Sequence, residues 1–101
     1  MANVFKNYTG QATTAGTAVY TVAAGTTAVV IGMNLANTAI SQQNASVQIG
    51  STYVVKDAPI PSGSALSVLD GKIIMESGEV ITVTGDNDNY VDVILSVLEQ
   101  S

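Results

Sequence analysis

Two acidic residues, Glu76 and Glu79, come closest in this sequence to a catalytic pair. Two carboxyl groups held close together act as acid and base, or as acid and nucleophile, in the hydrolysis of glycosidic bonds. These two flank Ser77-Gly78, which is a turn signal, and solvated acids are common beside turns. We therefore interpret them as turn residues and expect no enzymatic activity.

The sequence lacks the residue types on which most other catalytic and metal sites depend. It contains no His, no Cys and no Arg, which excludes the usual zinc clusters, Ser-His or Cys-His nucleophile pairs and arginine clamps on phosphate. The run Asp86 to Asn89 offers oxygen atoms to a Ca²⁺ ion, but four consecutive residues cannot all converge on one ion. Asn and Asp are typical of tight turns. We expect a hairpin loop there, with no metal and no cofactor.

The charge balance argues against two further classes of partner. Lys6, Lys56 and Lys72 are the only cations, and the net charge is −5. Nucleic-acid binding requires several phosphates to be neutralised, so we expect no nucleic-acid partner. The longest apolar run, residues 28–36, is shorter than the roughly 20 residues of a membrane helix, so we expect no membrane partner. The first residues show no secretory signal pattern.

The composition suggests a surface that another protein covers. Charged residues make up 11% of the 101 residues, against about 25% in an ordinary domain. Eleven Thr and nine Ser supply neutral polar groups, while 47% of the residues are hydrophobic. An exterior with so few charges is expected to expose apolar areas that meet a partner. The length fits one domain, which self-associates or docks.

Short strands separated by turn residues are expected to position these side chains. Gly, Pro, Asn and Asp recur roughly every 8–12 residues between alternating apolar runs, which is typical of a sandwich or barrel. Asp70-Gly71 is a strong hairpin signal and predicts that the strands on either side pair with each other. We expect an all-β fold, an antiparallel β-sandwich of jelly-roll or Ig-like type with about eight strands. The expected strands are 18–22, 28–36, 46–49, 52–60, 64–69, 72–76, 79–84 and 90–99.

The run 28–36 is predicted to be a central strand with two different faces. Alternate residues of a strand point to opposite sides. One side is large and apolar and is expected to face the core: Val29, Ile31, Met33 and Leu35. The other side is small and uncharged and is expected to contact a partner or subunit, with Val30, Gly32 and Asn34 as its contact residues.

Two other segments are candidate contacts. Residues 1–17 are expected to form either an N-terminal arm or an edge strand with a linker, with Phe5 and Tyr8 as contact residues, ahead of a sandwich domain at 18–101. Pro59 and Pro61 end the strand 52–60, since Pro cannot donate to a sheet ladder. They form either a rigid turn or a loop that fixes a contact with a partner.

Several motifs occur in a distinctive order. They are YTVAAGTTAVV at 20–30, ANT at 36–38, KDAPIPSGS at 56–64 and GKIIMESGEVITVT at 71–84. In this order the chain resembles small virion proteins of tailed bacteriophages over residues 18–99. Ala23 stands where those proteins usually have Pro, which loosens the turn but leaves the strands unchanged.

The resemblance implies a structural role in the virion. It implies a capsid decoration or cement protein on the exterior of the phage head, made in the host cytoplasm, with the major capsid protein as its partner. It also implies a homo-oligomer, and a trimer in particular. The alternative is a tail-associated adhesion or host-surface carbohydrate-binding module. Sugar sites usually stack aromatic rings, and this chain has no Trp and only five aromatics: Phe5, Tyr8, Tyr20, Tyr53 and Tyr90.

Overall fold

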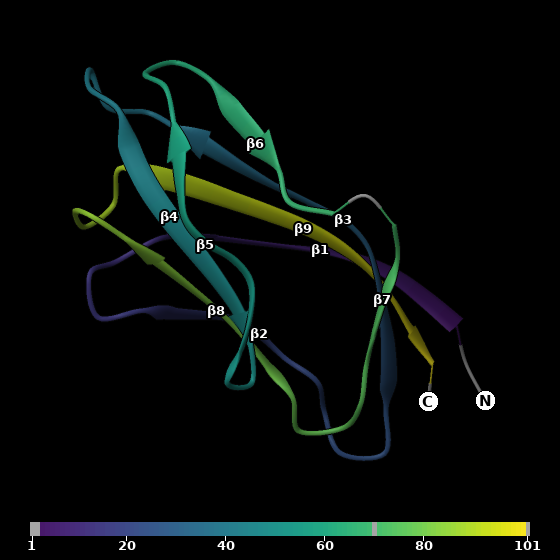
Figure 1. Ribbon diagram of the computed structural model, residues 1–101. Coiled ribbons are helices and arrows are strands. Elements are labelled where there is room, and N and C mark those ends of the chain that lie inside the picture. Colours follow the sequence, from purple (N-terminus) through teal and green to yellow (C-terminus); the bar gives the residue numbers. More distant parts are fainter. Residues whose placement is uncertain (1–2, 70, 101) are drawn as a thin grey trace.

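The computed structural model describes residues 3–69 and 71–100, which fold into an antiparallel β-sandwich (Figure 1). The expected fold class is confirmed. Within the described residues no helix is long and apolar enough to cross a membrane. The strands are β1 (Asn3–Gln11), β2 (Thr17–Thr21), β3 (Thr27–Asn37), β4 (Gln43–Ile49), β5 (Thr52–Ile60), β6 (Ala65–Ser67), β7 (Ile73–Met75), β8 (Val80–Gly85) and β9 (Val91–Gln100).

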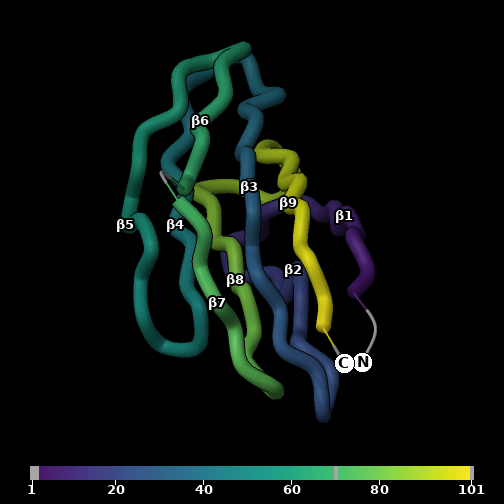
Figure 2. Tube along the Cα trace, turned by 90° about the vertical axis from the view of Figure 1, so that its right-hand side faces the viewer, coloured from purple at the N-terminus to yellow at the C-terminus, as the bar shows by residue number. Residues whose placement is uncertain are grey.

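The strands form two sheets. The larger sheet has the order β1-β9-β3-β6, and β7 also pairs with β3. The smaller sheet has the order β2-β8-β4-β5. In Figure 1 strands β4 and β5 of the smaller sheet lie in front of β9 and β1. Figure 2 shows β5 and β1 on opposite sides of the sandwich. The last strand, β9, therefore lies inside the larger sheet between two strands from the first half of the chain.

The core fills the space between the sheets with one face of each strand. In β9 the alternation read from the sequence holds, because Val91, Val93, Leu95 and Val97 are all buried. Side chains of the smaller sheet meet them. Every buried side-chain nitrogen or oxygen among the described residues has a hydrogen-bond partner, as is usual for buried polar groups. The buried residues that the smaller sheet contributes include Tyr20, Ala45, Val47, Ile60, Ile81 and Val83.

The expected faces of the central strand are wrong in its first half. The register between β3 and β9 shifts between Val30 and Gly32. An extra residue in one strand of a pair reverses the side to which the following residues point. Before the shift Val30 is buried, and after it Met33 and Leu35 are buried, whereas Ile31 at the shift is 41% exposed.

The expected hairpin at Asp70-Gly71 is also wrong. Residues Val30 to Ala28 of β3 pair with β7, and residues Ala36 to Asn34 of the same strand pair with β6. Both short strands are antiparallel to β3, so they run in the same direction and follow each other along one edge. The turn signal was local, while the long free edge of β3 decides the pairing. Asp70 itself lies outside the described residues.

The N-terminal segment forms a strand of the larger sheet. β1 pairs with β9 along its whole length, from Asn3 opposite Gln100 to Gln11 opposite Asp92. It is an edge strand, which was one of the two expected arrangements for residues 1–17. At the other side of the sandwich β5 is the edge of the smaller sheet, which explains how it tolerates Pro59.

Candidate functional site

An apolar patch covers part of the outer face of the larger sheet. Four side chains from four strands form a row across it, because Ile74 pairs with Val29, Val29 with Leu98, and Leu98 with Phe5. Phe5 is 73% exposed and Ile74 67% exposed. Exposed hydrophobic residues that cluster in this way mark interaction sites. We call the following residues the apolar patch: Phe5, Val29, Ile31, Ile74, Ile94 and Leu98.

The outer face of the smaller sheet has a different chemistry. The corresponding row there pairs Ala18 with Thr82, Thr82 with Gln48, and Gln48 with Tyr53. The neighbouring pair is Ser46 and Thr84. These side chains are small or polar, and most can hydrogen bond with water. The outer face of the larger sheet therefore carries an apolar patch among polar pairs such as Asn7 with Ser96 and Gln11 with Asp92, whereas the row across the smaller sheet is small or polar.

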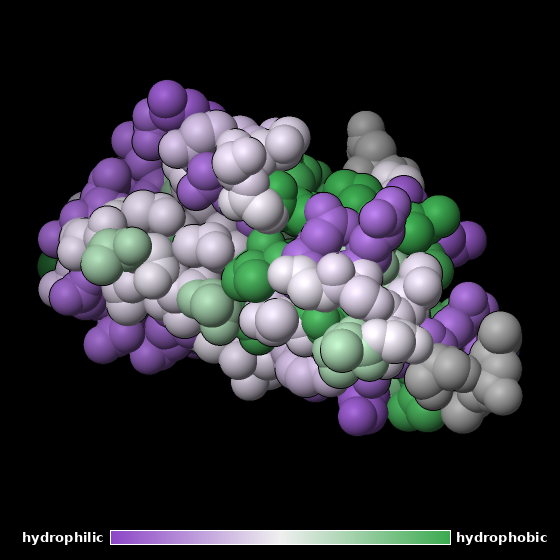
Figure 3. All heavy atoms as spheres, turned by 90° about the horizontal axis from the view of Figure 1, so that it is seen from below, coloured by the Kyte–Doolittle hydropathy of each residue, from purple (hydrophilic) through white to green (hydrophobic). Residues whose placement is uncertain are grey.

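The surface between and around these faces is mixed in character. Seen from below the view of Figure 1, hydrophobic side chains reach the surface between hydrophilic ones (Figure 3).

Two shallow hollows lie on the outer face of the larger sheet. One, of about 210 Å³, lies beside Phe5 and Ile31. The other, of about 380 Å³, is lined by Asn34, Ala36 and Ile94 among others. The apolar patch is thus a broad surface with shallow hollows and not a deep ligand cavity.

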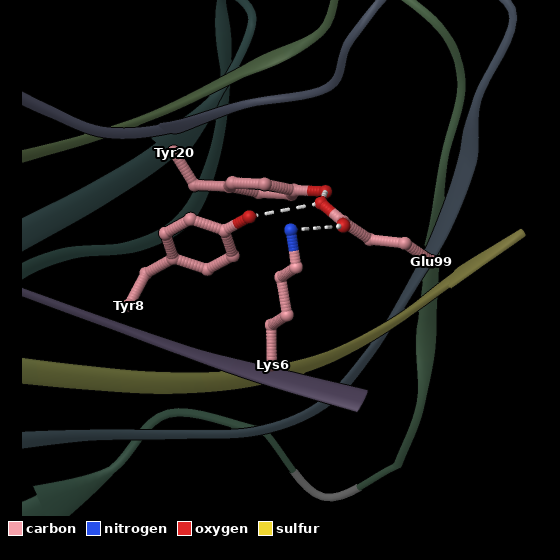
Figure 4. A network of polar contacts seen from close by, with 4 residues as sticks. All are labelled: Lys6, Tyr8, Tyr20 and Glu99. Carbon is pink, nitrogen blue, oxygen red and sulfur yellow. Dashed lines mark hydrogen bonds and ion pairs between the residues drawn. The ribbon is translucent and has the colours of Figure 1, made fainter. Parts of the chain in front are cut away.

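A polar cluster joins the two sheets at the β1 side of the sandwich (Figure 4). The hydroxyl of Tyr20 donates to Glu99 Oε2 at 2.7 Å, and that of Tyr8 donates to the same oxygen at 3.0 Å. The Nζ of Lys6 lies 3.5 Å from Glu99 Oε1. The two Tyr rings pack with their centroids 4.5 Å apart. Strands β1, β2 and β9 are thereby tied together through one carboxylate.

The cluster shifts the titration of its own members. The hydrogen bond from Tyr20 lowers the pKa of the Glu99 carboxyl below its ordinary value of 4.5, against the opposing effect of burial, and Tyr8 and Lys6 lower it further. Burial, together with the bond to Glu99, raises the pKa of the Tyr20 and Tyr8 hydroxyls above 10.0. Each bond is therefore strongest with an ionised acid and protonated phenols, which is the state at neutral pH.

The residues expected to contact a partner lie in different places. Phe5 lies in the apolar patch, and Gly32 and Asn34 lie on the outer face of the same sheet. Tyr8 points toward β2 and belongs to the polar cluster. Val30 is 1% exposed and belongs to the core, so its expected role as a contact residue is wrong. The register shift between Val30 and Gly32 reverses the face to which the side chains of β3 point. Pro59 and Pro61 are exposed at the end of β5, on the smaller sheet.

Ile74 and Leu98 were missed by the sequence reading, although they complete the row of the patch. In the run around Ile74 nothing local distinguishes this residue from a core residue. The alternation of β9 places Leu98 on the side away from the core, but it does not show which side chains of other strands lie beside it. Only the register of four strands brings them beside Phe5. The polar cluster was missed for the same reason, because Tyr20 and Glu99 are 79 positions apart.

The acidic residues considered as catalytic or metal-binding candidates instead accept hydrogen bonds in turns and loops. Glu79 Oε1 accepts a hydrogen bond of 2.7 Å from the main-chain N–H of Glu76, which closes the turn between β7 and β8. Asp88 Oδ1 accepts from the N–H and hydroxyl of Thr14, and Asp86 Oδ2 accepts from the N–H of Asn44. These carboxylates hold loops together. Among the described residues no group of three or more His, Cys, Asp or Glu side chains is placed to hold a metal ion.

The loop after β3 is held by a buried amide. Asn37 is 3% exposed, and its side-chain nitrogen donates to the carbonyls of Ser41 and Ile60 while its oxygen accepts from the N–H of Ala39. At the tip of this loop Ile40 is 100% exposed. A loop held by these hydrogen bonds thus presents an apolar side chain to solvent.

No known protein family matches this chain, and no curated protein is significantly similar to it. Function is therefore inferred from the two sheet faces and from the order of the sequence motifs.

Proposed function

We propose that this protein is a structural protein of a tailed-phage virion, which decorates the head exterior and stabilises the lattice by binding the major capsid protein as a homo-oligomer. The order of motifs from Tyr20 to Thr84 supports a virion protein. The observation that carries a binding role is the asymmetry of the two outer faces. A binding protein needs one face that prefers contact and one that tolerates water.

The patch suits a protein surface better than a small molecule. Small ligands are usually held in concave pockets that bury most of the ligand. Here the exposed side chains of Phe5 and Ile74 stand on a sheet face with shallow hollows. Burying such side chains against a matching apolar surface is favourable by about 25 cal/mol per Å² of apolar area removed from water. None of the six side chains of the apolar patch is charged, so burying the patch itself imposes little desolvation cost.

The first test is the copy number of the chain in purified phage particles, measured by quantitative mass spectrometry against the major capsid protein. A simple fraction of the capsid protein supports decoration of the head. A few copies per particle would move the protein to the tail and favour the adhesion alternative. Absence from particles would overturn the virion role.

The second test asks whether the apolar patch is the docking face. Particles lacking the protein are mixed with purified variants and sedimented. We expect Ile74→Asp and Phe5→Asp to stay in the supernatant, because each places a charge in the contact. Thr82→Asp, on the polar outer face, is the matched control and should bind as the unmodified chain does. Equal binding by all of these variants would contradict the assignment of the face.

A further inference from the structure

β1 is the one long and regular sheet edge among the described strands. It has nine residues, contains no Pro, and pairs with β9 without a register shift. The other edges are interrupted. β5 contains Pro59, has a positive φ of 49° at Asp57, and pairs with register shifts. β2 has five residues and a shift, and β6 and β7 have three residues each.

Half of the main-chain groups of β1 point away from the sheet. The N–H of Ala12, just beyond the strand, donates to the carbonyl of Val91 at 2.9 Å. Main-chain groups alternate in direction along an antiparallel strand. Counting back by two, the main-chain groups of Gly10, Tyr8, Lys6 and Val4 face β9, and those of Asn3, Phe5, Asn7, Thr9 and Gln11 face outward. In agreement, the carbonyl of Gln11 accepts from the side-chain hydroxyl of Thr17, the first residue of β2, at 2.8 Å and not from a main-chain group of β9.

We propose that β1 pairs antiparallel with β1 of a second copy of this chain, about a twofold axis at Asn7. An exposed regular edge is a template for another strand, and self-pairing is the one combination of two regular edges that the described strands offer. In this register Asn7 faces Asn7 of the other copy and Phe5 faces its Thr9. Moving the axis to Lys6 would place two like charges opposite each other, which is unfavourable. Moving it to Phe5 would leave the last residues of β1 without a partner strand.

The charges of the edge favour this register. The chain carries a net charge of −5, so two copies repel each other in general. The charged side chain of β1 is Lys6, which is 51% exposed. The register places it opposite Tyr8 of the other copy, whose hydroxyl is bonded to an acid, Glu99. A cation beside an aromatic ring and an acid is attracted to both.

The pairing has two consequences for the assembly. It is isologous, so it closes as a dimer, in contrast to the trimer that the family resemblance implies. It also joins the two larger sheets into one, with both apolar patches on the same outer face. The inference depends on the strand edge alone and not on the proposed virion role, because the free chain should dimerise without particles.

The test is the mass of the full chain in solution, by light scattering and sedimentation across a wide range of concentration. We expect a species of twice 10.3 kDa. A monomer at every concentration, or a trimer, would overturn the proposal.

Charge swaps at the axis test the register. Asn7→Lys and Asn7→Asp should each be monomeric and folded by circular dichroism, because each places like charges opposite one another. An equimolar mixture of the two should recover the dimer as a heterodimer. Asn3→Lys is the matched control, since residue 3 faces Gln11 of the other copy, and it should remain dimeric. A dimer that survives Asn7→Lys, or a mixture that stays monomeric, would contradict pairing about Asn7.

A single cysteine gives an independent check that does not depend on charge, because the chain has no Cys. Facing Cα atoms of a hydrogen-bonded antiparallel pair are about 5.5 Å apart, which is within disulfide range. Asn7→Cys should oxidise to a covalent dimer, whereas Thr9→Cys, which faces Phe5, should not. Equal cross-linking of both variants would contradict the register.

Discussion

Tyr20 on β2 donates a hydrogen bond of 2.7 Å to Glu99 on β9, and so connects the edge of the smaller sheet to the centre of the larger one. Tyr20 is 4% exposed, and Tyr8 on β1 shares the same acceptor oxygen. The contact therefore connects the two sheets at the margin of the apolar core, next to solvent.

Removing the Tyr20 hydroxyl should weaken the fold. Tyr20→Phe keeps the ring but loses a hydrogen bond to a charged group, so we expect a loss of about 1.5–3 kcal/mol in the free energy of unfolding, measured by urea denaturation. Tyr53→Phe is the control, because Tyr53 is 47% exposed, and it should change stability by less than about 0.5 kcal/mol. Equal effects of the two substitutions would show that the tie adds no stability.

The same tie should make stability depend on pH in acid. The pKa of Glu99 is lowered in the folded chain, so its contribution is complete above about pH 4.5 and is lost as the pH falls through the lowered value. Glu99→Gln should therefore be less stable than the unmodified chain at neutral pH. The difference should shrink as the pH falls, in thermal unfolding followed at several pH values. A difference that stays constant with pH would refute the assignment.

The same tie should also weaken in strong base. The raised pKa values of Tyr20 and Tyr8 mean that their contribution is complete below about pH 10.0 and is lost as the pH rises through the higher folded values. We expect stability to fall above that pH, and to fall less steeply in Tyr20→Phe. The measurement is urea denaturation across the alkaline range.

The bulge in β3 predicts opposite results for two positions, Ile31 and Leu35, that uninterrupted alternation would place on the same face. Leu35 is fully buried, so Leu35→Ala should cost about 2–5 kcal/mol. Ile31 is 41% exposed on the outer face, so Ile31→Ala should cost less than about 1 kcal/mol. Chemical denaturation of both variants checks this. A large loss at Ile31 would mean that the strand alternates without interruption.

The buried amide of Asn37 should be required for the loop after β3. Asn37→Ala removes bonds to Ser41, Ile60 and Ala39 and leaves buried carbonyls without a partner, which costs about 1–3 kcal/mol. Hydrogen exchange should show a faster rate at Ala39, whose N–H loses its acceptor. Asn34→Ala, on the outer face, is the control and should leave that rate unchanged.

The sequence predicts the strands well and their pairing less well. The alternation in β9 identifies its buried face, because its other face carries Asp92 and Ser96. In β3 both faces are apolar, so one extra residue near Ile31 leaves no mark on the pattern and reverses the assignment of Val30. The turn at Asp70-Gly71 suggests a hairpin, yet which strands meet is decided by tertiary packing.

The candidate site depends on register, which local patterns do not contain. Phe5 is predicted as a contact residue because it lies in a segment expected to be an arm or an edge strand. Ile74 and Leu98 become part of the same surface only after β7, β3, β9 and β1 are aligned. The polar cluster likewise requires three strands, and neither Tyr20 nor Glu99 differs in its local setting from an ordinary strand residue.

The position of β9 has a consequence for how the chain folds. This strand contacts β1 on one side and β3 on the other, and it follows both by more than half of the chain. During synthesis the larger sheet cannot close until β9 has emerged, so β1 and β3 lack the strand that pairs with both of them until then. Contacts between residues so distant in sequence are slow to form. The edge of β1 and the apolar side chains of β3 are then accessible to other nascent chains, which makes this interval the one in which misassembly would begin.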